Sequence, residues 1–142
     1  MIKYFLLWFP MFFIAILNGT ARDLGYKKYL SEIAARQLST FTLLILIGMY
    51  IFFVIKKYPP ASSTKALLLG LFWMLLTLDF EFGFGLYRGN TWIQLLDDYN
   101  MFRGHLWLLV PVWLTLAPYI FFKMGKRNRK TGAKCKIISV IR

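Results

Sequence analysis

The chain has 142 residues, of which 58% are hydrophobic and 19% aromatic, and a net charge of +12. A water-soluble domain of this length would expose too much apolar surface, so the composition indicates a compact membrane protein. The single cysteine, Cys135, excludes an internal disulfide, and no Cys/His cluster offers a metal site, so we expect neither metal nor cofactor.

Four apolar runs cover residues 4–17, 38–55, 66–84 and 106–122. A helix needs about 20 apolar residues to cross the hydrocarbon core of a bilayer. We therefore predict an all-α fold, a bundle of four transmembrane helices at about 4–18, 31–56, 64–84 and 105–123. Residues 1–123 then form the membrane domain, and residues 124–142 form a basic cytoplasmic tail.

The first run leaves two interpretations open. Lys3 makes a basic start and Gly19-Thr20-Ala21 resembles a cleavage site, as in a signal peptide, so residues 1–21 could be removed. Bulky aromatic side chains such as Trp8 favour a retained first span. Pro10, in its middle, is tolerated in a membrane helix when neighbouring groups satisfy the freed carbonyl.

The second and third helices have recognisable start signals. Ser31 can begin a helix that runs into the second apolar run, which places Arg36 and Gln37 at its outer end. The pair Pro59-Pro60 ends that helix, and one of the residues in Ser62–Thr64 can cap the next.

A short helix is predicted in the last connection, where Asn90 or Thr91 can act as the cap. The residues that follow at positions i, i+3, i+4 and i+7 form one apolar face: Trp92, Leu95, Leu96 and Tyr99. We expect this helix to lie in the headgroup plane with its aromatic side chains as anchors.

The basic residues indicate an orientation. Connection 56–65 has three lysines and no acid, and residues 123–142 have eight basic residues and no acid. By the positive-inside rule both segments, and both termini, are cytoplasmic. Connection 18–37, with four basic and two acidic residues, fits the outer side least well. We expect the tail to bind anionic lipid headgroups, at about 1 kcal/mol per basic residue, rather than nucleic acid.

Two carboxylates interrupt the third apolar run, in the stretch "LTLDFEFGFG". Asp79 and Glu81 are about 200° apart on a helix, so they face different partners. Gly70 and Thr77 share the stripe of Glu81, and small and polar residues mark the face where membrane helices pack. Glu81 is therefore predicted to face the bundle, and Asp79 to face the other side, as an interface residue or a contact with another protein.

Glu81 lies about 24 Å along the helix from Lys65, in the outer third of the membrane. A carboxylate there is costly unless it is paired. We expect it to meet at least one arginine and to gain further hydrogen bonds from Gln37 or Tyr26. The candidate arginines at that level are Arg22, Arg36 and Arg103.

Three further features surround this polar cluster. Gly83 and Gly85 are expected to let the helix unwind and other backbone approach. Asp98 and His105 complete the candidate polar residues of the outer side, although a lone histidine is weak evidence for a general base. The cluster is either a site for a small ligand, a lipid headgroup or a proton, or a structural contact that fixes the packing of the helices.

Two stretches, "NGTARDLGYKKYLSEIAARQLST" and "FEFGFGLYRGNTWIQLLDDYNMFRGHLW", resemble a family of small four-helix bacterial inner-membrane proteins without an established activity. The resemblance covers about two thirds of the chain and implies the topology, not a chemistry. The matching signature residues are Arg22, Gln37, Glu81, Asp98, Tyr99, Asn100 and Arg103. The stretch "RGHLW" has His105 where the family pattern would have a second basic residue.

The expected function is that of a multi-pass protein of the bacterial inner membrane, non-catalytic, acting as an accessory or as a ligand- or lipid-binding protein. Its expected partners are membrane lipids and either a second copy or another membrane protein. One alternative is a small oligomeric transporter in which Glu81 takes up a proton or ion. Another is a lipid-acting enzyme that uses Glu81 or Asp98 with His105.

Overall fold

A computed structural model describes residues 2–97 and 99–140, with side chains described up to residue 133 apart from residue 98. Within these residues every regular element is helical, which confirms the predicted all-α class. Four helical segments are long and apolar enough to cross a membrane: Ile2–Tyr29, Glu32–Lys57, Ser63–Tyr87 and Leu106–Ala133.

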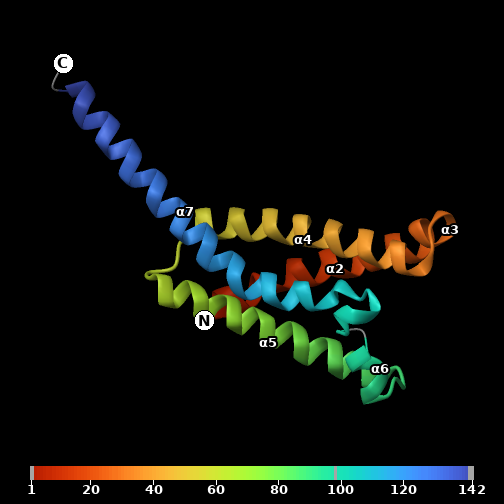
Figure 1. The fold of residues 1–142 in the computed structure, drawn as a ribbon. Helices are drawn as coiled ribbons and strands as arrows, with labels where there is room; N and C mark the ends of the chain where they lie inside the picture. The colour runs from red at the N-terminus through yellow and green to blue at the C-terminus, as the bar shows by residue number, and fades with distance from the viewer. Residues whose placement is uncertain (1, 98, 141–142) are drawn as a thin grey trace.

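The four segments lie side by side (Figure 1). In chain order the helices are α1 (Ile2–Leu6), α2 (Trp8–Ala21), a π-helical turn (Arg22–Tyr26), α3 (Lys27–Tyr29), α4 (Glu32–Lys57), α5 (Ser63–Tyr87), α6 (Trp92–Asp97), two 3-10 turns (Met101–Arg103 and Leu106–Leu108) and α7 (Leu109–Val140). α3 and α6 lie at one end, here called the loop end, and α1, the α4–α5 connection and the end of α7 lie at the opposite, terminal end.

The first helical segment is longer than the predicted 4–18. It is interrupted at Leu7, because Pro10 lacks an N–H group and its ring crowds the carbonyl of the residue four positions earlier. The helical backbone then continues past Gly19, since the N–H group of Arg22 still donates to the carbonyls of Asn18 and Gly19. A glycine permits a helix to end but does not force it to.

The predicted caps of the next two spans are confirmed. The hydroxyl of Ser31 accepts from the N–H group of Ala34 at 3.3 Å, and the hydroxyl of Ser62 accepts from that of Lys65 at 3.2 Å. These bonds satisfy backbone donors that the first turn of a helix leaves unpaired. They place the starts of α4 and α5 within one residue of the predicted positions.

α5 and α7 pack most closely, through the predicted stripe of α5. A Cβ atom at Gly70 would lie 2.8 Å from the carbonyl oxygen of Leu114 and closer still to that of Thr115. Further along the stripe, the hydroxyl of Thr77 accepts from the indole N–H of Trp8 at 3.0 Å. The small and polar residues of the stripe therefore face neighbouring helices, as expected.

α2 joins α4 through a buried polar contact. The side-chain amide of Asn18 donates to the carbonyl oxygen of Ser39 at 2.9 Å and to its hydroxyl at 2.8 Å. On the same side of α4, the hydroxyl of Tyr50 donates to the carbonyl of Leu7 at 3.0 Å, where α1 and α2 meet. These bonds hold the first segment against the rest of the bundle at two levels.

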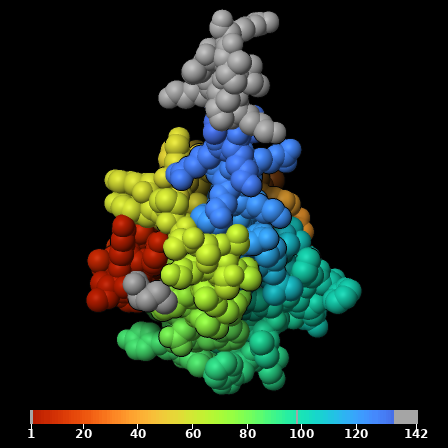
Figure 2. All heavy atoms as spheres, turned by 90° about the vertical axis from the view of Figure 1, so that its left-hand side faces the viewer, coloured from red at the N-terminus to blue at the C-terminus, as the bar shows by residue number. Residues whose placement is uncertain are grey.

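α7 extends well beyond the predicted 105–123. A 3-10 turn, Leu106–Leu108, occupies its predicted start, and the helix itself runs from Leu109 to Val140, so the basic segment is helical as well. Lysine, arginine and alanine favour a helix, and no proline follows Pro118. In Figure 1 the last part of α7 projects from the terminal end of the bundle, away from the other helices, and Figure 2 shows the blue part of α7 beside the start of α5 at this end.

The outer surface of the bundle is rich in large apolar side chains. Exposed examples occur on every span: Phe13, Leu17, Phe41, Ile45, Phe53, Leu68, Leu75 and Val112. In a water-soluble protein such a surface would be an association or aggregation site.

Candidate functional site

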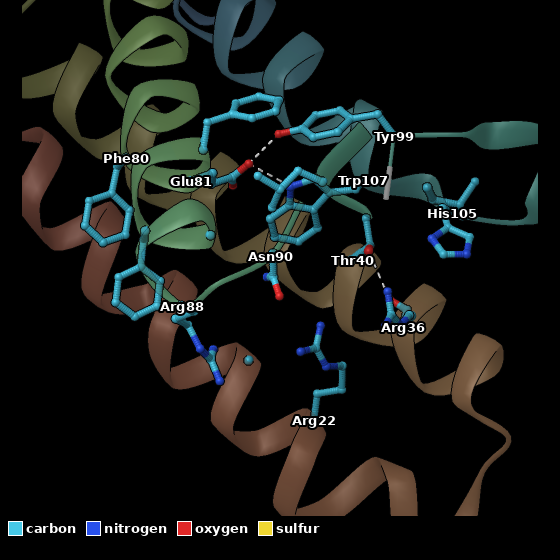
Figure 3. A pocket seen from close by; sticks show the side chains of 16 residues that line it. Arg22, Arg36, Thr40, Phe80, Glu81, Arg88, Asn90, Tyr99, His105 and Trp107 are labelled. Atoms are coloured by element: carbon cyan, nitrogen blue, oxygen red, sulfur yellow. Dashed lines mark hydrogen bonds between the residues drawn. The ribbon is translucent and has the colours of Figure 1, made fainter. Parts of the chain in front are cut away.

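A pocket of about 350 Å³ opens at the loop end of the bundle (Figure 3). Its walls come from the end of the first segment, the start of α4, the end of α5, and the chain from Arg88 through α6 to the 3-10 turn before α7. The ionisable side chains that line it are Arg22, Arg36, Glu81, Arg88, Tyr99 and His105. The structure therefore brings together four residues that the sequence had singled out: Glu81, Arg22, Arg36 and His105.

Glu81 is half-buried and held by two aromatic donors. Its Oε2 atom accepts from the hydroxyl of Tyr99 at 2.5 Å and from the indole N–H of Trp107 at 2.9 Å (Figure 3). The side chains expected to complete its hydrogen bonds were Gln37 and Tyr26, so the sequence missed these two donors. Tyrosine and tryptophan near a carboxylate are a usable signal, because each carries a polar group that needs a partner when buried.

The predicted position of Tyr99 is wrong: it does not lie on the apolar face of the short helix. α6 ends at Asp97, and the chain then turns, with the N–H group of Tyr99 donating to the carbonyl of Leu96 at 3.1 Å. The turn breaks the helical phase and directs the tyrosine toward α5. There its ring stacks on Phe82, with centroids 5.7 Å apart and planes 8° from parallel.

The predicted unwinding of α5 at Gly83 and Gly85 is wrong, because the helix continues to Tyr87. It ends where Gly89 adopts a positive φ of 84°, the conformation that terminates many helices. The expected close approach at Gly85 is confirmed, since a Cβ atom there would overlap the side chain of Leu95. This contact seats α6 on the end of α5, while Thr91 and Gln94 cap α6 reciprocally.

Three arginines from three separate parts of the chain line the pocket (Figure 3). Arg22 also contacts its neighbour Asp23, with Nε 3.1 Å from Oδ1, and Arg36 contacts Glu32, with Nη2 3.2 Å from Oε1. Arg88, which the sequence did not single out, lies 5.7 Å from the ring centroid of Phe84.

The remaining candidates lie elsewhere. Gln37 donates to the carbonyl of Gly104 at 3.2 Å, next to His105, instead of reaching Glu81. Arg103 pairs with Asp97 at 2.9 Å and is not among the described pocket residues. Asp79 is exposed on the opposite side of α5, as predicted. Asp98 lies outside the described residues.

The arrangement suits an anionic group. Among the described lining residues, three guanidinium groups and the imidazole of His105 share the pocket with one carboxylate, whose Oε2 already accepts two hydrogen bonds. A guanidinium presents a planar set of donors that matches the oxygens of a phosphate or carboxylate.

In comparisons with protein-family models, with curated proteins and with solved structures, no match to this chain was found.

Proposed function

We propose that this chain is a four-span membrane protein that binds an anionic, phosphate- or carboxylate-bearing group in the pocket at its loop end. The observation that carries the proposal is the convergence of Arg22, Arg36 and Arg88 from three separate elements on one pocket. The three side chains belong to the π-helical turn, to α4 and to the end of α5, so the site forms only when these segments pack together, and an anion there would meet guanidinium donors from all three.

Membrane insertion is supported by the four apolar segments and by the exposed apolar side chains along their length. α5, with 25 residues, is about 37 Å long, enough to cross the hydrocarbon core. A bilayer would cover the apolar surface that water would otherwise meet.

We further propose the bacterial inner membrane as its location, with the terminal end in the cytoplasm. The lysine-rich α4–α5 connection and the basic part of α7 lie at the same end of the bundle, which favours that orientation. Membership of the family that the sequence resembles stays a prediction.

Cysteine labelling tests this orientation. In a Cys135→Ser background, a membrane-impermeant maleimide added to intact spheroplasts should label Ile93→Cys at the loop end but not Asn128→Cys in α7. Both positions are exposed in the structure, so lysis should make both reactive. Labelling of Asn128→Cys in intact spheroplasts would show that the proposed orientation is wrong.

The anion site is tested with arginine variants in mild detergent. Wild-type protein should bind dioleoyl phosphatidic acid, counted by native mass spectrometry, in preference to dioleoyl phosphatidylcholine. Glycerol 3-phosphate, a soluble anion, should raise the melting midpoint. Arg22→Gln and Arg88→Gln should each weaken phosphatidic acid binding about tenfold or more, since hydrogen bonds to charged groups contribute about 1.5–3 kcal/mol.

Lys28→Gln is the matched control, because it removes one positive charge from the same end of the bundle, at an exposed position that is not among the residues lining the pocket. If the pocket variants bind phosphatidic acid as well as this control does, the proposed function is wrong.

A lipid-acting enzyme is the second candidate, favoured by one observation: Glu81 and His105 line the same pocket. Chromatography of the phosphatidic acid after incubation would reveal hydrolysis products, which His105→Gln should abolish. The transporter alternative stays a prediction.

A further inference from the structure

A second, apolar cavity lies beside the polar pocket. It is a groove of about 480 Å³ between α5 and α7 that presents only apolar atoms. Met74, Leu78 and Phe82 form its α5 wall. The facing wall is formed by Leu108, at the end of the 3-10 turn before α7, and by Val112 and Leu116 of α7. The groove is open on the outer surface of the bundle, where the proposed function places lipid.

The groove runs along the helices, not across them. Met74 and Phe82 are eight residues apart on α5, or about 12 Å, and on the facing wall Leu108, just before α7, and Leu116 are also eight residues apart. Phe82 and Leu108 lie toward the loop end, and Met74 and Leu116 toward the middle of their spans. The groove therefore extends from the level of the polar pocket toward the middle of the proposed membrane, the direction that an acyl chain takes from a headgroup.

The two cavities share a wall, because Phe82 and Tyr99 line both. Their stacked rings form this wall, and the hydrogen bond from Tyr99 to Glu81 holds it at the edge of the pocket. A molecule that crosses this edge meets guanidinium groups on one side and apolar side chains on the other.

We propose that the ligand is a single anionic lipid, with its phosphate among Arg22, Arg36 and Arg88 and a hydrocarbon chain in the groove. This inference rests on the proposed function and adds the ligand class. A soluble anion has no hydrocarbon chain, so it would leave the apolar groove unfilled.

Filling the groove separates the lipid from a soluble anion. Val112→Trp and Leu116→Trp enlarge exposed side chains of the groove wall without changing any pocket residue. Ile120→Trp is the matched control, because it makes a similar change on the outer surface of the same helix outside the groove. The probes are dioleoyl phosphatidic acid, counted by native mass spectrometry, and glycerol 3-phosphate, followed by the shift in melting midpoint.

The two groove variants should bind phosphatidic acid about tenfold more weakly than the Ile120→Trp control, the effect of withdrawing roughly two methylene groups from apolar contact. Their melting shift with glycerol 3-phosphate should match that of the control. Equal phosphatidic acid binding by groove variants and control would overturn the lipid assignment.

The result that would contradict the proposed anion site differs from the result that would contradict the lipid assignment. If Arg22→Gln binds phosphatidic acid like wild type, the anion site is wrong, whatever the groove variants do. If Arg22→Gln loses binding while both groove variants retain it, the anion site stands and the lipid chain is not in the groove.

Discussion

Replacing Glu81 with leucine is expected to lower the free energy of unfolding by about 2–4 kcal/mol, because it leaves two donors without their acceptor. The hydroxyl of Tyr99 and the indole N–H of Trp107 both donate to Glu81 Oε2, and they tie the chain after α6 and the chain before α7 to α5. Glu81→Gln retains an acceptor oxygen, so its loss should be smaller. Unfolding in a mixed detergent titration would measure both.

Asp79→Leu is the matched control for this prediction. It removes the other carboxylate of the same helix, two residues away, where the side chain is exposed. Surface changes of this kind are usually within about 0.5 kcal/mol of neutral. If Asp79→Leu and Glu81→Leu unfold at the same denaturant concentration, the hydrogen bonds to Glu81 do not stabilise the bundle.

Gly70→Ala should also lower the free energy of unfolding, by about 1–3 kcal/mol, because the added methyl group enters the contact between α5 and α7. The atoms in its way are the main-chain oxygens of Leu114 and Thr115, which cannot move aside as a flexible side chain can. The two helices must separate or shift along each other. The groove between them would change shape, so phosphatidic acid binding should fall in the same variant.

Gly83→Ala makes the same substitution on the same helix at a position with no atom within 4 Å of the added Cβ. Alanine is more favourable than glycine inside a helix by about 0.5–1 kcal/mol, so this variant should be as stable as wild type or slightly more stable. A Gly70→Ala variant as stable as Gly83→Ala would contradict the close packing of α5 on α7.

These stability effects and the ligand proposals concern the same contacts. Glu81 does more than carry a charge in the pocket, because it positions Tyr99, whose ring separates the pocket from the groove. Glu81→Leu should therefore alter lipid binding together with stability. Val112→Trp and Leu116→Trp leave this hydrogen bond in place, so they test lipid binding separately from the stability that Glu81 provides.

The starts of α4 and α5 were determined by the sequence alone, through residues near each helix end. Ser31 was identifiable as a cap, and Ser62 as one of three candidates, because the bond that a cap makes reaches only three residues along the chain. Helical periodicity placed Gly70, Thr77 and Glu81 on one face of α5. Their small or polar side chains predicted that this face packs against other helices. The extra length of α7 was missed because apolarity, not helix propensity, set the predicted end of the span.

The partners of Glu81 were decided only by the tertiary structure. Tyr99 and Trp107 reach it from 18 and 26 residues away, and they do so because Leu95 rests on Gly85 and the chain turns after α6. Helical periodicity carried past Asp97 put Tyr99 on the wrong face. A short-range sequence pattern predicts the direction of a side chain only while the backbone stays regular. Which side chains meet beyond a turn depends on packing between segments that are far apart in the chain.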